Sequence, residues 1–249
     1  MRFFIQFSYF GKAYHGWQNQ PNAITVQEVL EKGMSKLLNS PVSLMGAGRT
    51  DTGVHAKMMY AHFDVDALED IQDYIFRLNS FLPNDIAVER IFEVKDDAHA
   101  RFHATARTYE YHIAKSKDPF TTDLAYFVKK ELDVEQMNIA ANLLLGKKDF
   151  ECFSKSNTDV FTNICDLREA QWSIKENNLI FTITADRFLR NMVRAIVGTL
   201  INVGLGKYSL DYVNTILKSK DRTKAGVSVP AKGLYLTSIV YPNTILKNG

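Results

Sequence analysis

The feature that most constrains the fold is an alternation between two hydrophobic periods over residues 1–103. Segments of period two predict strands, because successive side chains of a strand point to opposite faces. Segments with a period of about 3.6 residues predict amphipathic helices. Thr25, with Glu28 three positions later, has the spacing of an N-terminal capping box. In chain order the prediction is a strand at 2–9, a helix at 25–40, strands at 42–48 and 57–66, a helix at 69–82, and a strand at 85–94.

The second half follows the same order without an obvious repeat of residues. A hairpin is predicted around Asn177–Asn178. Gly146 is predicted to end the helix that begins at residue 133. The predicted elements are a strand at 105–114, a helix at 133–146, strands at 164–174 and 179–185, helices at 187–204 and 210–217, and a strand at 233–242.

Both halves therefore have the βαββαβ order of the ferredoxin-like fold. We predict an α+β protein with an N-terminal half at 1–103 and a C-terminal half at 104–249. Two open sheets of this kind can join edge to edge into one mixed, mainly antiparallel sheet. Helices would then cover one side of the sheet, and a cleft would lie on the other.

Composition excludes several other classes of protein. The 249 residues are 46% hydrophobic and 23% charged, which is typical of a soluble globular protein with a substantial core. No apolar run approaches the ~18 residues of a membrane span, and the N-terminus lacks a secretory pattern. Two cysteines, Cys152 and Cys165, are too few for a disulfide framework and fit a reducing cytoplasm. Without a Cys-x-x-Cys pair, a structural zinc site is not expected.

The stretch GAGRTDTGVHA, residues 46–56, places the carboxylate of Asp51 in a glycine-rich turn. A dinucleotide-binding loop is excluded because Asp51 stands where a third glycine is needed and a strand follows. An aspartic protease needs two carboxylates that share a proton, but a second Asp-Thr/Ser-Gly is absent. Arg49 would also keep Asp51 ionised, which is the wrong state for such a dyad. Asp51 is therefore either a capping residue of the turn or a single functional carboxylate.

Two sets of basic residues suit a nucleic-acid surface. Period two places basic groups and tyrosines on one face of the strand at 105–114 and its approach, where phosphate contacts and base stacking can combine. Helical spacing places three arginines within about 60° of one another on the helix at 187–204. A row of arginines is more often a solvated edge than a binding site, but at the open mouth of a sheet it could meet phosphates. The members are Arg101, His103, Thr105, Arg107, Tyr109 and Tyr111 on the strand, and Arg187, Arg190 and Arg194 on the helix.

The remaining polar candidates are weaker. His99 and His103 have a metal-like spacing but lack nearby Cys or Glu partners, which favours hydrogen-bonding or surface roles. His55 and His62 are expected to be structural or close to RNA. Cys152 and Cys165 are expected to be small buried hydrophobic residues.

Several motifs together resemble the tRNA pseudouridine synthase A family, and the similarity spans essentially the whole chain. The Gly-Arg-Thr-Asp-x-Gly-Val-His stretch is the most specific of them. The motifs are YFGKAYHGWQNQPNAITVQEVLE, GAGRTDTGVHA, LNSFLPNDIAV, HARFHATARTYEY, FLRNMVRAIVG and GLYLTSIVYP, in the family's order.

The resemblance implies a cytoplasmic, cofactor-free and metal-free isomerase. It would convert uridine to pseudouridine at positions 38, 39 and 40 of the tRNA anticodon arm, as a homodimer that binds tRNA across both subunits. By motif position, Asp51 is the nucleophile and Arg194 its ion-pair partner, and Tyr109 packs on the target base. Arg49 helps to hold that base out of the helix. The expected substrate-binding set also includes His55, Arg107, Arg187 and Arg190.

The chain departs from the family pattern at three places. Phe10 replaces the usual Asp, Thr52 replaces the usual Ala after the nucleophile, and residues 162–164 lack a basic residue common there. These departures concern RNA contacts rather than the chemistry. The alternative to an enzyme is an RNA-binding module of the same fold without turnover, against which the intact Asp51, Tyr109 and Arg194 set argues.

Overall fold

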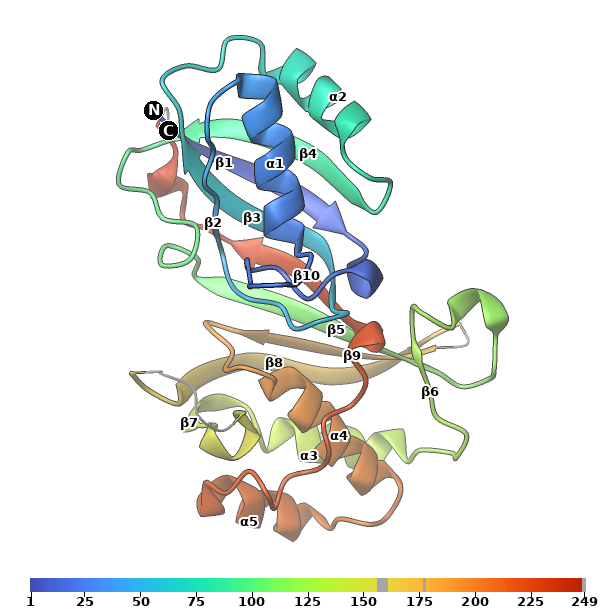
Figure 1. Cartoon of the computed structure of the whole chain (residues 1–249). Coiled ribbons are helices and arrows are strands. Elements are labelled where there is room, and N and C mark those ends of the chain that lie inside the picture. Colours follow the sequence, from blue (N-terminus) through green and yellow to red (C-terminus); the bar gives the residue numbers. More distant parts are fainter. Residues whose placement is uncertain (156–160, 177, 248–249) are drawn as a thin grey trace. The chain divides into compact units, whose positions relative to one another are not determined.

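The computed structural model describes residues 1–155, 161–176 and 178–247 (Figure 1). The chain divides into two compact units. Unit 1 comprises Met1–Ala106 and Leu236–Gly249, and unit 2 comprises Arg107–Tyr235. The end of the chain thus groups with its beginning. The predicted division into halves, between residues 103 and 104, stays a prediction.

Unit 1 is built on three antiparallel strands with β1 in the centre. Ile5 of β1 lies opposite Ala61 of β3 and Ile91 of β4, and all three residues are buried. Both helices of the unit lie on one face of these strands (Figure 1). The elements are β1 (Arg2–Tyr9), α1 (Val26–Leu38), β2 (Met45–Gly46), β3 (His55–Asp64), α2 (Ile71–Phe81) and β4 (Ile86–Val94), with β2 and β10 (Leu234–Val240) beside β3.

The predicted capping of α1 is confirmed, and α2 is capped in the same way. Thr25 is the N-cap of α1, and its hydroxyl accepts a hydrogen bond from the Glu28 amide at 3.3 Å. Asp70 caps α2 through the amide of Asp73. These side chains satisfy amides that the first helical turn leaves without a partner, and so they fix where each helix begins.

The strand predicted at 42–48 is wrong in length, because β2 contains only Met45–Gly46. Val42 and Leu44 are buried as a strand would require. Their backbone groups, however, bond to side chains of α1. The Val42 amide donates to Ser35 Oγ at 2.9 Å, and the Leu44 amide donates to Glu31 Oε1 at 2.8 Å. Burial was predicted correctly, but the helix supplies the hydrogen bonds.

Unit 2 contains the second set of strands and the remaining helices. Its strands run in the order β5, β9, β8, β7, each antiparallel to its neighbour, and β6 pairs parallel to β5. The three helices gather on one side of these strands (Figure 1). The elements are β5 (Ala106–Ala114), β6 (Tyr126–Phe127), α3 (Val134–Asn142), β7 (Gly146–Asp149), β8 (Ile164–Lys175), β9 (Asn178–Ala185), α4 (Met192–Gly204) and α5 (Leu210–Ser219).

Helix α3 ends at Asn142, earlier than the predicted end at Gly146. The amides of Leu143, Leu144 and Leu145 donate to carbonyls three residues back, so the chain tightens out of α-helical geometry. Gly146, at φ 91°, begins β7 instead. Of the predicted hairpin turn, Asn177 lies outside the described residues, and Asn178 begins β9.

Short 3₁₀ segments complete the described chain: η1 (Gly11–Ala13), η2 (Pro119–Thr121), η3 (Glu151–Phe153), η4 (Ala231–Gly233) and η5 (Asn243–Ile245). Within the ranges that the structure describes, no helix is long and apolar enough to cross a membrane. The predicted α+β class, the βαββαβ order of unit 1 and the mainly antiparallel pairing are confirmed.

Candidate active site

Asp51 lies in a tight turn that connects β2 to β3 in unit 1. The Val54 amide donates to the Asp51 carbonyl at 3.1 Å, which closes the turn. Gly53 occupies the third position with φ 77°, a left-handed value that glycine adopts without a steric penalty. The side chain of Asp51 is half-buried, and that of Arg49 is exposed. Asp51 therefore opens the turn, and Arg49 lies two residues before it in the chain, with its side chain at the surface of the unit.

His55 follows this turn and is almost fully buried, with 2% of its surface exposed. Its Nδ1 accepts a hydrogen bond from the Gly11 amide at 3.0 Å, so Nδ1 carries no proton in this arrangement. The ring stacks on Phe10, with 4.5 Å between centroids and 10° between planes. Phe10, one of the departures from the family pattern, thus packs against an imidazole in this chain.

Tyr109 lies on β5 of unit 2 and is half-buried. Its ring meets the ring of Phe188 edge-on, with 5.2 Å between centroids and 89° between planes. Phe188 lies just before α4, in a part of the chain that is not helical. An edge-on partner fixes the orientation of the tyrosine ring.

Arg194 lies in the first turn of α4, the most thoroughly buried helix of unit 2. Its Nε donates to the Val229 carbonyl at 2.8 Å, and the Val229 amide donates to the Arg194 carbonyl at 3.2 Å. The arginine is thus bound to the 225–230 segment through both its backbone and its side chain. The Nε bond orients the guanidinium, and the backbone bond holds the segment beside it.

The predicted row of three arginines on one helix is wrong. Helix α4 begins at Met192, after Asn191 in a left-handed conformation at φ 66°, so only Arg194 is helical. Asp186 Oδ1 accepts from the Arg187 amide at 2.7 Å, and the chain from Arg187 to Leu189 is neither helix nor strand. The Arg190 carbonyl accepts from the Lys155 amide at 3.0 Å. A neighbouring carboxylate and a distant backbone amide therefore bond to residues that periodicity predicted to be helical.

The predicted basic and aromatic strand face is also only partly correct. Strand β5 begins at Ala106, so Arg101 and His103 lie before it in a turn. Tyr111 is fully buried and donates to the Pro230 carbonyl at 2.8 Å, and burial raises the pKa of its phenol. Arg107 and Tyr109 remain half-buried on this face. Arg107 Nη1 donates to the Asp186 carbonyl at 2.7 Å.

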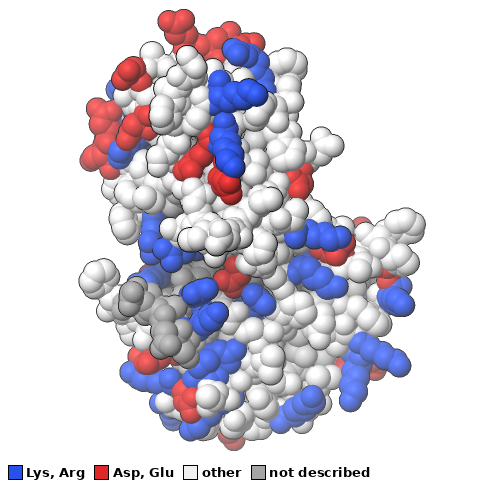
Figure 2. Space-filling view, in the orientation of Figure 1, with Lys and Arg blue, Asp and Glu red and all other residues white. Residues whose placement is uncertain are grey.

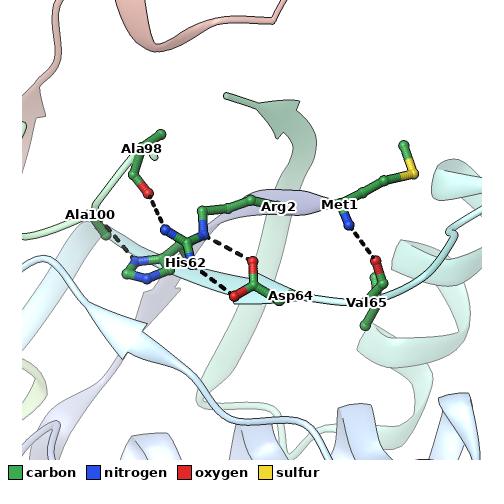
Figure 3. A network of polar contacts seen from close by, with 7 residues as sticks. All are labelled: Met1, Arg2, His62, Asp64, Val65, Ala98 and Ala100. Atoms are coloured by element: carbon green, nitrogen blue, oxygen red, sulfur yellow. Dashed lines mark hydrogen bonds and ion pairs between the residues drawn. The ribbon is translucent and has the colours of Figure 1, made fainter. Parts of the chain in front are cut away.

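The histidines of the 99–103 segment serve as hydrogen-bond acceptors. His99 Nδ1 accepts from the Arg101 amide, and His103 Nδ1 accepts from the His99 amide, each at 3.1 Å. His62 Nδ1 accepts from the Ala100 amide at 3.1 Å (Figure 3). These contacts confirm the predicted hydrogen-bonding role. The part of the chain that the structure describes holds no cluster of three or more His, Cys, Asp or Glu residues that could bind a metal.

An ion pair lies beside these histidines. Arg2 forms a two-pronged contact with Asp64, at 2.9 and 2.8 Å, and donates to the Ala98 carbonyl at 3.1 Å (Figure 3). Arg2 thereby links β1, the end of β3 and the 95–100 segment.

Cys152 and Cys165 are buried as predicted, and burial raises the pKa of each thiol to about 12.

Charge is distributed unevenly between the two units. Unit 2 carries 19 Lys and Arg residues against 15 Asp and Glu residues, a net charge of +4, whereas unit 1 carries 11 against 13, a net charge of −2. The visible surface of unit 2 in Figure 2 accordingly shows many lysine and arginine side chains. A positive unit favours an anionic partner such as a nucleic acid.

Comparison with known proteins identifies the family. Residues 5–103 and 140–242 match a family model described as tRNA pseudouridine synthase. The tRNA pseudouridine synthase A of Parabacteroides distasonis is 49% identical over 247 residues, which cover 98% of this chain and 97% of that protein. The protein of the same name from Bacteroides thetaiotaomicron is 50% identical, covering 98% and 92%. That from Thermoanaerobacter pseudethanolicus is 43% identical, covering 95% and 98%. The resemblance predicted from the motifs is confirmed, and the chain belongs to the tRNA pseudouridine synthase family of isomerases.

Proposed function

We propose that this protein converts uridine to pseudouridine at positions 38, 39 and 40 of the tRNA anticodon arm, with Asp51 as the catalytic carboxylate. The names of the relatives, which match over nearly their whole length, support the substrate and the reaction. The observation that supports Asp51 is its place in a closed, glycine-dependent turn at the family's most specific motif.

The reaction dictates what the site must do. The bond between C1′ and N1 breaks, the uracil turns, a bond between C1′ and C5 forms, and the proton on C5 leaves while N1 gains one. None of this can occur inside a stacked helix, so the nucleotide must flip out at a cost of a few kcal/mol. An ionised carboxylate then acts as the nucleophile or stabilises a cationic sugar.

The remaining roles follow from residue chemistry. Tyr109 offers a flat ring for the flipped base and a hydroxyl that can take part in removing the C5 proton. Arg194 is proposed to pair with Asp51 and to orient its carboxylate. Arg49 is proposed to hold the base out of the helix.

The other members of the substrate-binding set divide by exposure. Arg107, Arg187 and Arg190 are proposed to bind phosphate groups of the tRNA. His55 belongs to the same proposed set, but its burial means that it acts by supporting the turn rather than by reaching the RNA surface. The expected homodimer and cytoplasmic location stay predictions.

The decisive experiment measures pseudouridine in an unmodified tRNA transcript incubated with the purified protein in EDTA, without added nucleotide. Wild-type protein should give product, because neither metal nor cofactor is required by the proposed chemistry. Asp51→Asn keeps the size of the side chain but removes its charge, so turnover should fall by about 10⁴ or more, with little change in tRNA affinity. Asp66→Asn, at an exposed carboxylate of the same unit, should leave turnover unchanged.

Two outcomes would contradict the proposal. If Asp51→Asn kept more than about a tenth of wild-type turnover, a loss of only about 1.4 kcal/mol or less, Asp51 would be a turn residue. If the wild-type protein bound tRNA tightly but gave no product at any of the three positions, it would be an RNA-binding module without turnover.

A further inference from the structure

The Asp51 turn rests on a second stretch of backbone that comes from the end of β1. We call residues 9–16 the supporting segment. The two stretches are joined by hydrogen bonds at three places, spread over the full length of the turn. These bonds are Tyr9 hydroxyl to Thr50 Oγ1 at 2.8 Å, Gly53 amide to Tyr14 carbonyl at 3.3 Å, and Gly11 amide to His55 Nδ1 at 3.0 Å.

Two glycines let the backbones meet without intervening side chains. A Cβ on Gly11 would lie 2.0 Å from the Val54 carbonyl oxygen. A Cβ on Gly16 would lie 2.3 Å from the Thr50 carbonyl oxygen and 3.3 Å from the Asp51 carbonyl carbon. Gly16 also has φ 87°, which disfavours any residue with a side chain. A methyl group at Gly16 would therefore push directly on the peptide that carries Asp51.

The supporting segment is itself anchored at both ends. The Tyr14 hydroxyl donates to Asp85 Oδ1 at 2.5 Å, and the Phe10 amide donates to the Asp85 carbonyl at 2.9 Å, just before β4. The Gly16 carbonyl accepts from the Val26 amide at 3.2 Å, at the start of α1. The residue before β4 and the first residue of α1 thus hold the supporting segment in place, and the supporting segment holds the Asp51 turn.

We propose that Tyr9 and Gly16 are positioning residues, which fix the place of the Asp51 carboxylate through Thr50 and the backbone of the turn. This inference rests on the proposed role of Asp51. A catalytic group displaced by about 1 Å can lose about 10²-fold in rate, so contacts behind the turn matter to the reaction without touching the substrate.

The first test is Gly16→Ala, compared with Gly146→Ala. Gly146 has a similar φ of 91°, but a Cβ there would meet nothing within 4 Å, so its variant carries the backbone strain alone. Gly16→Ala should lower the single-turnover rate by about 10²-fold while the Kd for tRNA changes less than about threefold. Gly146→Ala should keep the wild-type rate. Equal rates for the two variants would overturn the role of Gly16.

The second test is a double-mutant cycle between Tyr9→Phe and Thr50→Val. Each variant removes a single hydroxyl and keeps the shape of the side chain, so the fold is disturbed little. Each variant should slow single turnover about tenfold, and the double variant should be no slower than either, because both remove the same hydrogen bond. Thr50→Ser keeps the hydroxyl and should restore most of the rate. Fully additive losses, or a Thr50→Ser variant as slow as Thr50→Val, would overturn the role of Tyr9.

Asp51→Asn, measured in the same series, separates this inference from the proposed function. If Asp51→Asn is inactive but Gly16→Ala and Tyr9→Phe turn over at the wild-type rate, the positioning inference fails and the proposed function stands. If Asp51→Asn is active, the proposed function fails, and the positioning inference fails with it.

Discussion

At the scale of single residues, the chemistry of a side chain depends on which of its atoms the fold has already engaged. Arg194 donates from Nε to the Val229 carbonyl, so the orientation of its guanidinium is set before any substrate arrives. A lysine could supply the same charge. It has no Nε–H in a planar fork, however, and could not make this contact while pointing its charge in the same direction.

We therefore predict that Arg194→Lys and Arg194→Ala both lower single turnover by at least about 10²-fold, with the lysine variant recovering little. The tRNA affinity should change much less than the rate, because one cation is a small part of a polyanion interface. Rapid-quench single-turnover kinetics and a binding titration would measure the two quantities. A lysine variant as fast as wild type would show that charge alone is sufficient.

The buried histidine His62 makes folding stability depend on pH. Burial, together with nearby Arg2 and His99, lowers its pKa from 6.5 to about 4, while Asp64 acts in the opposite direction. The unfolded chain therefore binds the proton more tightly than the folded one. The stabilising contribution is present above pH 6.5 and is lost as the pH falls toward 4, with a slope of at most about 1.4 kcal/mol per pH unit.

His62→Asn should flatten this part of the pH dependence, because the amide oxygen can accept the Ala100 hydrogen bond but does not titrate in this range. Urea unfolding of wild type and variant at several pH values between about 7 and 4 would measure the effect. Ser43→Asn, at an exposed residue that does not titrate, is the control and should keep the wild-type slope. Parallel curves for wild type and His62→Asn would count against this account.

At the scale of elements, α4 shows how a helix is placed by its neighbours rather than by its own residues. A Cβ on Gly198 would lie 1.9 Å from the Val227 carbonyl oxygen, so the helix touches the 225–230 segment through bare backbone. Thr199 strengthens the contact by accepting a hydrogen bond from the Gly226 amide at 2.8 Å. The same segment binds Arg194.

Gly198→Ala should therefore lower the free energy of unfolding by about 1–3 kcal/mol, although alanine is the better helix former by about 1 kcal/mol. The matched control is Gly204→Ala at the end of the same helix, where a Cβ would meet the flexible side chain of Met137. Thermal unfolding of both variants would measure the difference. An increase in Tm for Gly198→Ala would contradict the close backbone contact.

At the scale of the whole molecule, the net charge of +2 hides the contrast between the −2 of unit 1 and the +4 of unit 2. An anionic partner is therefore attracted mainly by unit 2. Because Arg187 and Arg190 do not share a helical face with Arg194, each is expected to contact tRNA independently.

Arg187→Ala and Arg190→Ala should each reduce the slope of log K against log salt concentration for tRNA binding by about one unit. When a phosphate contact is lost, that phosphate keeps its counterion, so binding releases one counterion fewer. Binding titrations over a range of salt concentrations would measure the slope. Arg77→Ala, on α2 of unit 1 and paired with Asp73 at 3.6 Å, is the control and should leave the slope unchanged. Unchanged slopes for both unit 2 variants would mean that these arginines are solvated.

Local periodicity and turn chemistry determined most of the elements from the sequence alone. Strand β1 is found at the predicted residues, and Thr25 caps α1 as predicted, because both depend only on residues close in the sequence. The motif at residues 46–56 likewise indicated the family, because its residues are contiguous in the chain.

The tertiary structure decided the local conformation wherever a partner from elsewhere in the chain bonds to the backbone or fills the space beside it. The side chains of α1 accept hydrogen bonds from the amides of Val42 and Leu44, which were predicted to lie in a strand. The amide of Lys155, 35 residues away, donates to the Arg190 carbonyl, and the chain at Arg190 is not helical as predicted. Gly16 carries no sign in the sequence that its missing side chain admits the backbone of Asp51. Such contacts join residues far apart in the chain, and a local pattern contains no information about which of them will meet.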